Sequence, residues 1–305
     1  MKQVRLWMMS AIFAISGASV FTACTDDSDN PFQPVVQVGI DKTNFPDDNF
    51  WNYLLEQDYG KDGVLTEAEI RNITVMDVSE KEIKSLKGIE YFTALRTLNC
   101  IGNELTELDI SGNTALDTLD CCYNELTALD VSKNTALRSL DCGINELTAL
   151  DVSKNTALTV LSCSGNSLTS LDISKNTALQ LLQCSGNDLT ALDVSANTSL
   201  VYMACDSNQL ATLDLSKNMA LNKLLCCNNQ ISGQNMDALI GSLRQNESEE
   251  FCEFYVMDGN EPNQNVCTKS QAAAAKAKGW LPQYWDEDEE VWQEYEGSEP
   301  IREKK

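Results

Sequence analysis

Leucines return at a fixed interval through the middle of the chain. The first of each set are Leu95, Leu116, Leu137, Leu158, Leu179, Leu200 and Leu221, each 21 residues after the last. Two further columns keep the same interval: Cys100, Cys121, Cys142, Cys163, Cys184, Cys205 and Cys226, and Asn103, Asn124, Asn145, Asn166, Asn187, Asn208 and Asn229. Because one such coil cannot bury its own leucines, the pattern predicts coils stacked into a solenoid.

Each coil contains a strand and an extended back. Leu98 and Cys100 alternate around Asn99, as the inward residues of a strand do. Leu108-Asp109-Ile110 repeats the alternation. About eleven residues separate the two half-motifs, which leaves little room for a helix of several turns. A degenerate copy from Ile73 to Leu86 precedes the regular coils, so we expect the solenoid to span residues 73–231.

The repeat LxxLxCxxNxLTxLDxSxNTA resembles the leucine-rich-repeat family, in a short bacterial form. The resemblance implies a mainly β solenoid with a parallel β-sheet face and a largely extended back face. It also implies that the asparagine column forms a ladder of side-chain bonds to turning backbone. The resemblance says almost nothing about function.

An open stack needs a cover at each end. Residues 38–72 predict an N-terminal helical cap, with a capped helix beginning near Asp47. Residues 232–285 predict a C-terminal α/β cap with a strand over 251–257 and a helix over 268–278. The acidic aromatic tail, 286–305, contains Trp292 and Tyr295, which either fold back onto the cap or contact a partner.

The N-terminus has the pattern of a bacterial lipoprotein. Residues 1–23 contain a basic start and an apolar run of roughly sixteen residues, typical of a signal peptide and short for a spanning helix. The segment ending at Cys24 resembles a lipobox, which implies lipidation of Cys24; ordinary secretion is the alternative. The acidic tether, 24–37, is similar to the signal that exports some lipoproteins to the cell surface. The expected localisation is lipid-anchored at the outer membrane.

Composition limits the chemistry. The chain has 305 residues, a net charge of −24, twelve cysteines and no histidine. The charge excludes nucleic acid as the default partner, and the missing histidine argues against an enzyme. We expect no cofactor, and expect the column cysteines to be reduced and packed as small hydrophobes, while a bridge between Cys252 and Cys267 stays open.

A calcium site is the one metal candidate. The segment from Asp58 to Glu69 resembles an EF-hand loop, which implies Asp58, Asp62 and Glu69 as side-chain ligands and Val64 as a carbonyl ligand. Gly60 replaces one carboxylate position. The alternative is that this loop forms a turn and binds no calcium.

A second acidic set, Asp109, Asp130, Asp151, Asp172, Asp193 and Asp214, occurs once per coil. Like charges stacked at strand spacing repel, and lysines three residues on, with Ser and Thr hydroxyls, are the expected compensation.

Recognition is expected on the outward positions of the strands. These positions run from polar to apolar, and the apolar ones gather late, at Val160, Leu181, Tyr202, Ala204 and Leu225. An exposed apolar patch indicates contact with another molecule, unless the C-terminal cap covers it. We expect a monomeric, non-enzymatic adaptor that binds a protein partner on the cell surface or host side. The alternative is a glycan-binding component of an uptake system.

Overall fold

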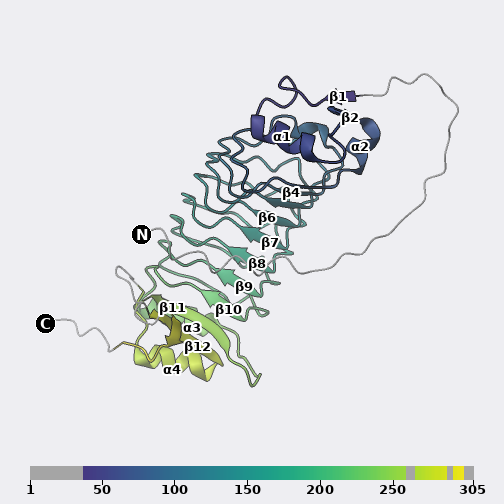
Figure 1. Ribbon diagram of the computed structural model, residues 1–305. Coiled ribbons are helices and arrows are strands. Elements are labelled where there is room, and N and C mark those ends of the chain that lie inside the picture. Colours follow the sequence, from purple (N-terminus) through teal and green to yellow (C-terminus); the bar gives the residue numbers. More distant parts are fainter. Residues whose placement is uncertain (1–36, 259–264, 287–290, 299–305) are drawn as a thin grey trace, which may run out of the picture. The chain divides into compact units, whose positions relative to one another are not determined.

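The computed structural model describes residues 37–258, 265–286 and 291–298. Its main feature is one eleven-stranded sheet in which the strands follow sequence order (Figure 1). The strands are β3 (Val75–Asp77), β4 (Thr97–Asn99), β5 (Thr118–Asp120), β6 (Ser139–Asp141), β7 (Val160–Ser162), β8 (Leu181–Gln183), β9 (Tyr202–Ala204), β10 (Lys223–Leu225), β11 (Cys252–Asp258), β12 (Trp280–Asp286) and β13 (Val291–Glu294). All neighbours pair in parallel except β12 and β13.

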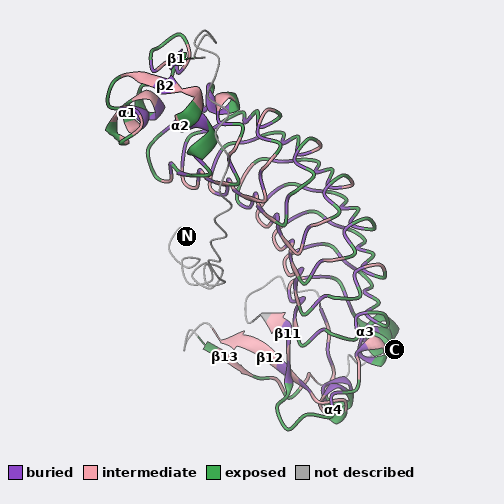
Figure 2. Cartoon of the chain, turned by 90° about the vertical axis from the view of Figure 1, so that its right-hand side faces the viewer, coloured by how far each residue is buried: buried purple, intermediate pink, exposed green. Residues whose placement is uncertain are grey.

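The regular coils contribute one three-residue strand each. The middle residue of each strand is buried, and the residue before it is partly exposed. Between Phe92 and Ser232 the back of the coils contains turns and no helix. The buried residues continue from coil to coil as one core (Figure 2). The predicted fold class, a leucine-rich-repeat solenoid with a parallel sheet, is confirmed.

The first asparagine column joins each coil to the one before it. In a representative coil, Asn187 Nδ2 donates to the carbonyl oxygens of Cys163 (3.1 Å), Cys184 (3.1 Å) and Ser185 (3.3 Å). Its Oδ1 accepts from the Leu168 amide at 3.0 Å. One buried side chain thus makes hydrogen bonds to backbone groups of two coils. These groups lie outside the strands and therefore have no strand partner.

A second asparagine column lies on the back of the coils, and it consists of Asn113, Asn134, Asn155, Asn176, Asn197 and Asn218. Asn176 Nδ2 donates to the carbonyls of Val152 (3.0 Å) and Asn155 (2.9 Å) in the coil before. The Oδ1 atoms of these six residues are buried without a hydrogen-bond partner. The two ladders therefore differ: the first is fully bonded and the second leaves one acceptor unpaired in every coil.

The cysteine column is packed in the core. All seven side chains are fully buried, and several thiols reach a backbone carbonyl of the next coil, as Cys100 Sγ does to Asp120 O at 3.4 Å. Eleven cysteines in the described residues are free thiols, including Cys252 and Cys267. Cys252 Sγ instead accepts from Arg244 Nη2 at 3.2 Å.

The N-terminal cap closes the first coil with aromatic side chains. It contains β1 (Gln37–Gly39), β2 (Val64–Thr66), α1 (Asp48–Glu56), α2 (Glu67–Asn72) and the 3-10 turn η1 (Ile89–Tyr91). Asp47 caps α1 through Oδ1, and its Oδ2 accepts from the Lys84 amide at 2.8 Å. Phe45 packs edge-on against Phe50 with ring centroids 5.7 Å apart. The cap and the first coil thus share one core.

The C-terminal cap continues the sheet. It contains α3 (Gly233–Ser242), α4 (Lys269–Ala277) and strands β11 to β13, with α4 against β12 and α3 against α4. Trp280 is fully buried, and its Nε1 donates to the Arg244 carbonyl at 3.0 Å. Part of the segment that the sequence assigns to the tail, Val291–Glu294, pairs with β12. Trp292 and Tyr295 therefore pack on the cap, the first of the two alternatives above.

Candidate functional site

A stripe of partly exposed apolar side chains crosses three neighbouring strands. Val160 on β7 is the register partner of Leu181 on β8, and Leu181 is the partner of Tyr202 on β9. Each is half-buried, whereas the next residue on the same strand is fully buried. We call Val160, Leu181 and Tyr202 the apolar stripe. Because adjacent parallel strands lie about 4.8 Å apart, these side chains form one continuous surface.

Ala204 and Leu225 do not belong to that surface. Each is 4% exposed, because both are buried together with Tyr255, and the side chains of Trp292 and of the stripe residue Tyr202 pack against this cluster. This corrects the expectation that both residues are available to a partner. The cause is the continuation of the sheet: Leu225 pairs in register with Tyr255, so the cap places a large ring directly beside it.

Aromatic rings end the stripe on the C-terminal side. Tyr255 packs edge-on against Trp292 at 4.5 Å between centroids, and Trp292 packs against Trp285 at 5.4 Å. Lys223 Nζ lies 5.9 Å from the Tyr202 ring and 5.1 Å from the Tyr255 ring, and pairs with Glu253 at 2.7 Å. The rings are held by one another and by Lys223, so this edge of the stripe is preformed.

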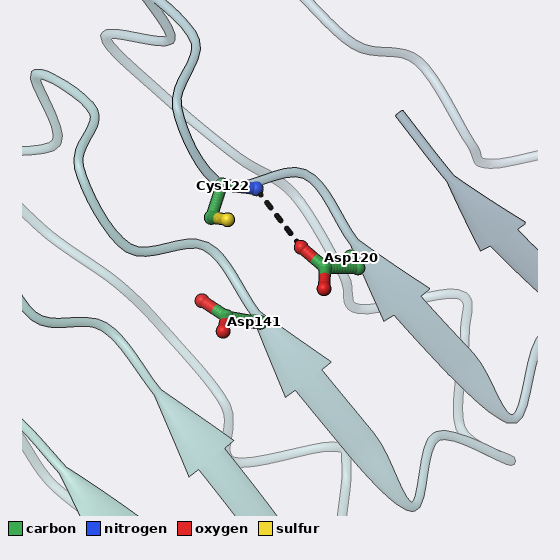
Figure 3. A group of neighbouring side chains, drawn as sticks. All are labelled: Asp120, Cys122 and Asp141. Carbon is green, nitrogen blue, oxygen red and sulfur yellow. Dashed lines mark hydrogen bonds between the residues drawn. The ribbon is translucent and has the colours of Figure 1, made fainter. Parts of the chain in front are cut away.

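An acidic pair lies on the N-terminal side of the stripe. Asp120 on β5 and Asp141 on β6 are register partners, and Cys122 follows β5 (Figure 3). One ligand atom from each of the three residues lies within 4.8 Å of the other two. Burial, together with the charge of Asp141, raises the pKa of Asp120 to about 6, and burial also raises the pKa of Asp141.

The sequence patterns do not predict that Asp120, Cys122 and Asp141 lie together. Two signals were present: aspartates occupy the same strand position in consecutive coils, and Cys122 is an additional cysteine beside the column member Cys121. Neither signal says that the thiol faces the carboxylates, which depends on how the chain turns after the strand.

The structure does not assemble the EF-hand-like set. Asp58 pairs with Lys61 at 2.5 Å, and Glu69 Oε2 accepts from the Thr66 amide and hydroxyl at 2.8 Å each, forming the capping box of α2. Asp62 Oδ1 accepts from the Val64 amide at 3.1 Å. In the described part of the chain the one group of three ligand side chains is the group at Asp120. The EF-hand-like side chains are therefore not gathered around one point in this structure, where Glu69 closes the capping box of α2, and calcium binding by this loop stays a prediction.

The once-per-coil aspartates are turn residues. Asp172 Oδ1, for example, accepts from the Ser174 amide at 2.9 Å. The hydrogen bonds to Ser174 lower the pKa of Asp172, and Lys175 adds a smaller effect in the same direction. The serine thus stabilises the negative charge of the aspartate more than the lysine does. This is the opposite of the order expected from the sequence.

The solved structures that are similar to this chain include three bacterial leucine-rich-repeat or internalin structures. The functional domain of InlJ from Listeria monocytogenes, described as including a cysteine ladder, is 34% identical with a TM-score of 0.64; the match covers 77% of this chain and 54% of that domain. Internalin C2 from the same organism is 21% identical (TM-score 0.59; 67% and 93% covered). The leucine-rich-repeat protein LIC12759 from Leptospira interrogans is 23% identical (TM-score 0.55; 64% and 50% covered).

The chain therefore spans about half the length of the InlJ domain that it matches. No protein-family model matches the chain, and a search of curated proteins finds no match either. Taken with the coil geometry, the likeness to InlJ shows that the chain has the leucine-rich-repeat solenoid fold.

The expected anchor lies outside the described residues. Residues 1–23, Cys24 and the tether up to residue 36 are not among them. Within the residues that are described, no helix is long and apolar enough to cross a membrane.

Proposed function

We propose that this protein is a non-enzymatic, lipid-anchored surface protein that captures a protein partner on the sheet face of its solenoid. Cys24 carries the lipid, the acidic tether leads to the cell surface, and the solenoid presents the apolar stripe. The likeness to InlJ and the fold shared with internalin C2 support a binding role in place of a catalytic one. The absence of histidine from the whole sequence agrees with that role.

The observation that carries the proposal is the apolar stripe itself. Three register-paired apolar side chains stay partly exposed on a face where the earlier coils place Thr97, Thr118 and Ser139 at the same position. A patch of exposed apolar side chains on a protein surface marks a site of contact with another molecule. The partner is a protein with an apolar contact surface, and a basic surround favours its association with a chain of charge −24.

The experiment is partner capture with two matched triple variants. The test variant is Val160→Ser, Leu181→Ser and Tyr202→Ser. The control variant, Thr97→Ala, Thr118→Ala and Ser139→Ala, changes the same column in coils without the stripe. Each protein is displayed on intact cells, crosslinked and analysed for attached proteins by mass spectrometry, after circular dichroism shows that both variants are folded.

We expect the test variant to lose the partner that the wild type and the control variant capture. Equal capture by the test variant and the wild type would contradict the proposal. Glycan binding is the competing result: the wild type then captures no protein and binds defined glycans on an array. That alternative rests on Trp285, Trp292 and Tyr295. In the structure Trp285 packs edge-on against Trp292 with ring centroids 5.4 Å apart, and Tyr295 packs edge-on against Tyr284 at 6.1 Å.

The anchor is tested separately. Replacing Cys24 by alanine is expected to abolish incorporation of labelled palmitate into the protein. Undiminished labelling of the Cys24→Ala variant would show that the lipid is attached elsewhere or by another route.

A further inference from the structure

Among the register pairs of the described strands, Asp120 and Asp141 are the one place on the sheet face where two carboxylates meet. The same strand position carries Asn99, Ser162 and Gln183 in the adjacent coils, all neutral. Parallel pairing in register brings the two charges together. Like charges facing each other at this spacing destabilise a sheet, so the pair needs a reason to exist.

The protein offers no cation to balance the pair. Asp120 Oδ1 accepts from the Cys122 amide at 3.2 Å, and Asp141 Oδ1 accepts from the Gly143 amide at 2.9 Å. In the described ranges neither carboxylate lies within 4.0 Å of a lysine or arginine nitrogen. Other acids near the strands do have such partners, as Asp117 has Arg96 at 3.6 Å and Glu253 has Lys223 at 2.7 Å. The Cys122 side chain also bonds to Asp120, and the Ser162 side chain bonds to Asp141, so both carboxylates have hydrogen-bond donors but, among the described residues, no positively charged partner.

Cys122 supplies a third donor of a different kind. The residue is 1% exposed, and its Sγ lies on the side that faces both carboxylates (Figure 3). The core does not require a thiol here, because Gly143, Ser164 and Ser185 occupy the same coil position. A bound divalent cation is the group that favours the charged forms of the two carboxylates and of the thiol at once.

We propose that Asp120, Cys122 and Asp141 form a binding site for a divalent transition metal ion, with zinc as the best match. Two carboxylate oxygens and one thiolate sulfur are a donor set that zinc accepts, with water in the fourth position. Calcium and magnesium are disfavoured, because both prefer oxygen ligands alone. Binding releases the thiol proton of Cys122 to solvent, so the affinity falls as the pH is lowered. The site lies beside the apolar stripe but does not depend on the proposed partner.

Cobalt is the probe, because a thiolate bound to Co²⁺ gives a charge-transfer band in the near ultraviolet and ligand-field bands in the visible. The full chain is stripped of metal, kept reduced and titrated with cobalt chloride, and zinc is then added as a competitor. We expect both sets of bands to appear at one equivalent of cobalt and to disappear on addition of zinc.

Three variants decide the assignment. Cys122→Ser is expected to lose the charge-transfer band. Asp141→Asn, which keeps the thiol, is expected to weaken cobalt binding by more than the roughly tenfold cost of losing an outer-shell partner. The matched control is Cys227→Ser, which removes the thiol at the same coil position as Cys122, where the strand ends in Leu225 and lacks an aspartate; it is expected to bind like the wild type.

The proposal is overturned if the wild type gives no bands, if the charge-transfer band survives in Cys122→Ser, or if Cys227→Ser loses it equally. Circular dichroism of each metal-free variant shows that it is folded. Should Cys122→Ser fail this check, the Asp141→Asn titration alone decides: unchanged affinity contradicts the site.

Discussion

Replacing Asn187 by alanine tests whether the first asparagine ladder holds the coils together. The side chain is 7% exposed and makes four hydrogen bonds. Its removal leaves the Leu168 amide without an acceptor. The Cys163 and Cys184 carbonyls each keep one donor, from Asn166 and Asn208 respectively.

The magnitude follows from these partners. An unpaired buried amide costs about 1–3 kcal/mol, and each lost bond to a carbonyl that keeps another donor costs about 0.5–1.5 kcal/mol. With one unpaired amide and three such bonds, Asn187→Ala is therefore expected to lower the free energy of unfolding by about 2.5–7.5 kcal/mol.

Asn176 in the second ladder is the matched control. It is fully buried and donates to Val152 and Asn155, whose carbonyls also accept backbone amides at 3.0 and 3.1 Å. Asn176→Ala leaves no backbone group unpaired and removes an Oδ1 that has no partner. The expected loss is about 0–2 kcal/mol, because removing an unsatisfied acceptor offsets the two lost bonds.

The assay is equilibrium urea unfolding followed by circular dichroism, under reducing conditions, with the two single variants beside the wild type. The reasoning requires Asn187→Ala to be less stable than Asn176→Ala, by at least about 1 kcal/mol. Equal losses, or a larger loss in Asn176→Ala, would refute the assignment of the first ladder as the one that carries stability.

Three further predictions concern local features. Ile144 has a left-handed backbone (φ 50°) where the next coil has Gly165, so Ile144→Gly is expected to raise stability by about 1 kcal/mol, and a lower melting temperature would contradict this. Calcium is expected to leave the melting temperature unchanged relative to EGTA, because Glu69 caps α2; a calcium-dependent rise would support the EF-hand interpretation. In metal-free protein the pKa of Asp120 is raised from 3.8 to about 6, so the folded protein holds this proton at pH values where the unfolded chain has lost it. The stability that the protonated carboxyl contributes is fully present below pH 3.8 and is lost as the pH rises through about 6. Asp120→Asn is therefore expected to exceed the wild type in melting temperature at neutral pH and to match it in acid; a constant difference would argue against the shift.

The solenoid was predictable because its signal is repeated. A leucine, a cysteine and an asparagine in every 21 residues leave one way to bury the apolar columns, and Leu98 and Cys100 are buried as the alternation requires. The cap helices were predictable from local capping patterns. The extension of the sheet through β13 was not, although β13 pairs with the strand directly before it, because the acidic sequence after Trp285 is typical of a solvated tail.

The sites were less predictable than the solenoid. Whether Leu225 is exposed depends on Tyr255, which reaches it only through strand pairing. Thr66 and Glu69 match both an EF-hand loop and a helix capping box. The sequence alone does not say whether the Glu69 carboxylate binds a calcium ion or caps α2. The orientation of the Cys122 side chain toward two carboxylates depends on the turn after β5, which no sequence pattern predicts.

The most direct test of the proposed function is crosslinking from a defined position. A photo-reactive residue is placed at Leu181, in the middle of the apolar stripe, or at Ser195, an exposed position of the same coil away from its strand. The account predicts that the Leu181 probe on intact cells yields one discrete protein adduct and that the Ser195 probe does not. Equal adducts from both positions, or an adduct from Ser195 alone, would contradict a partner bound on the sheet face.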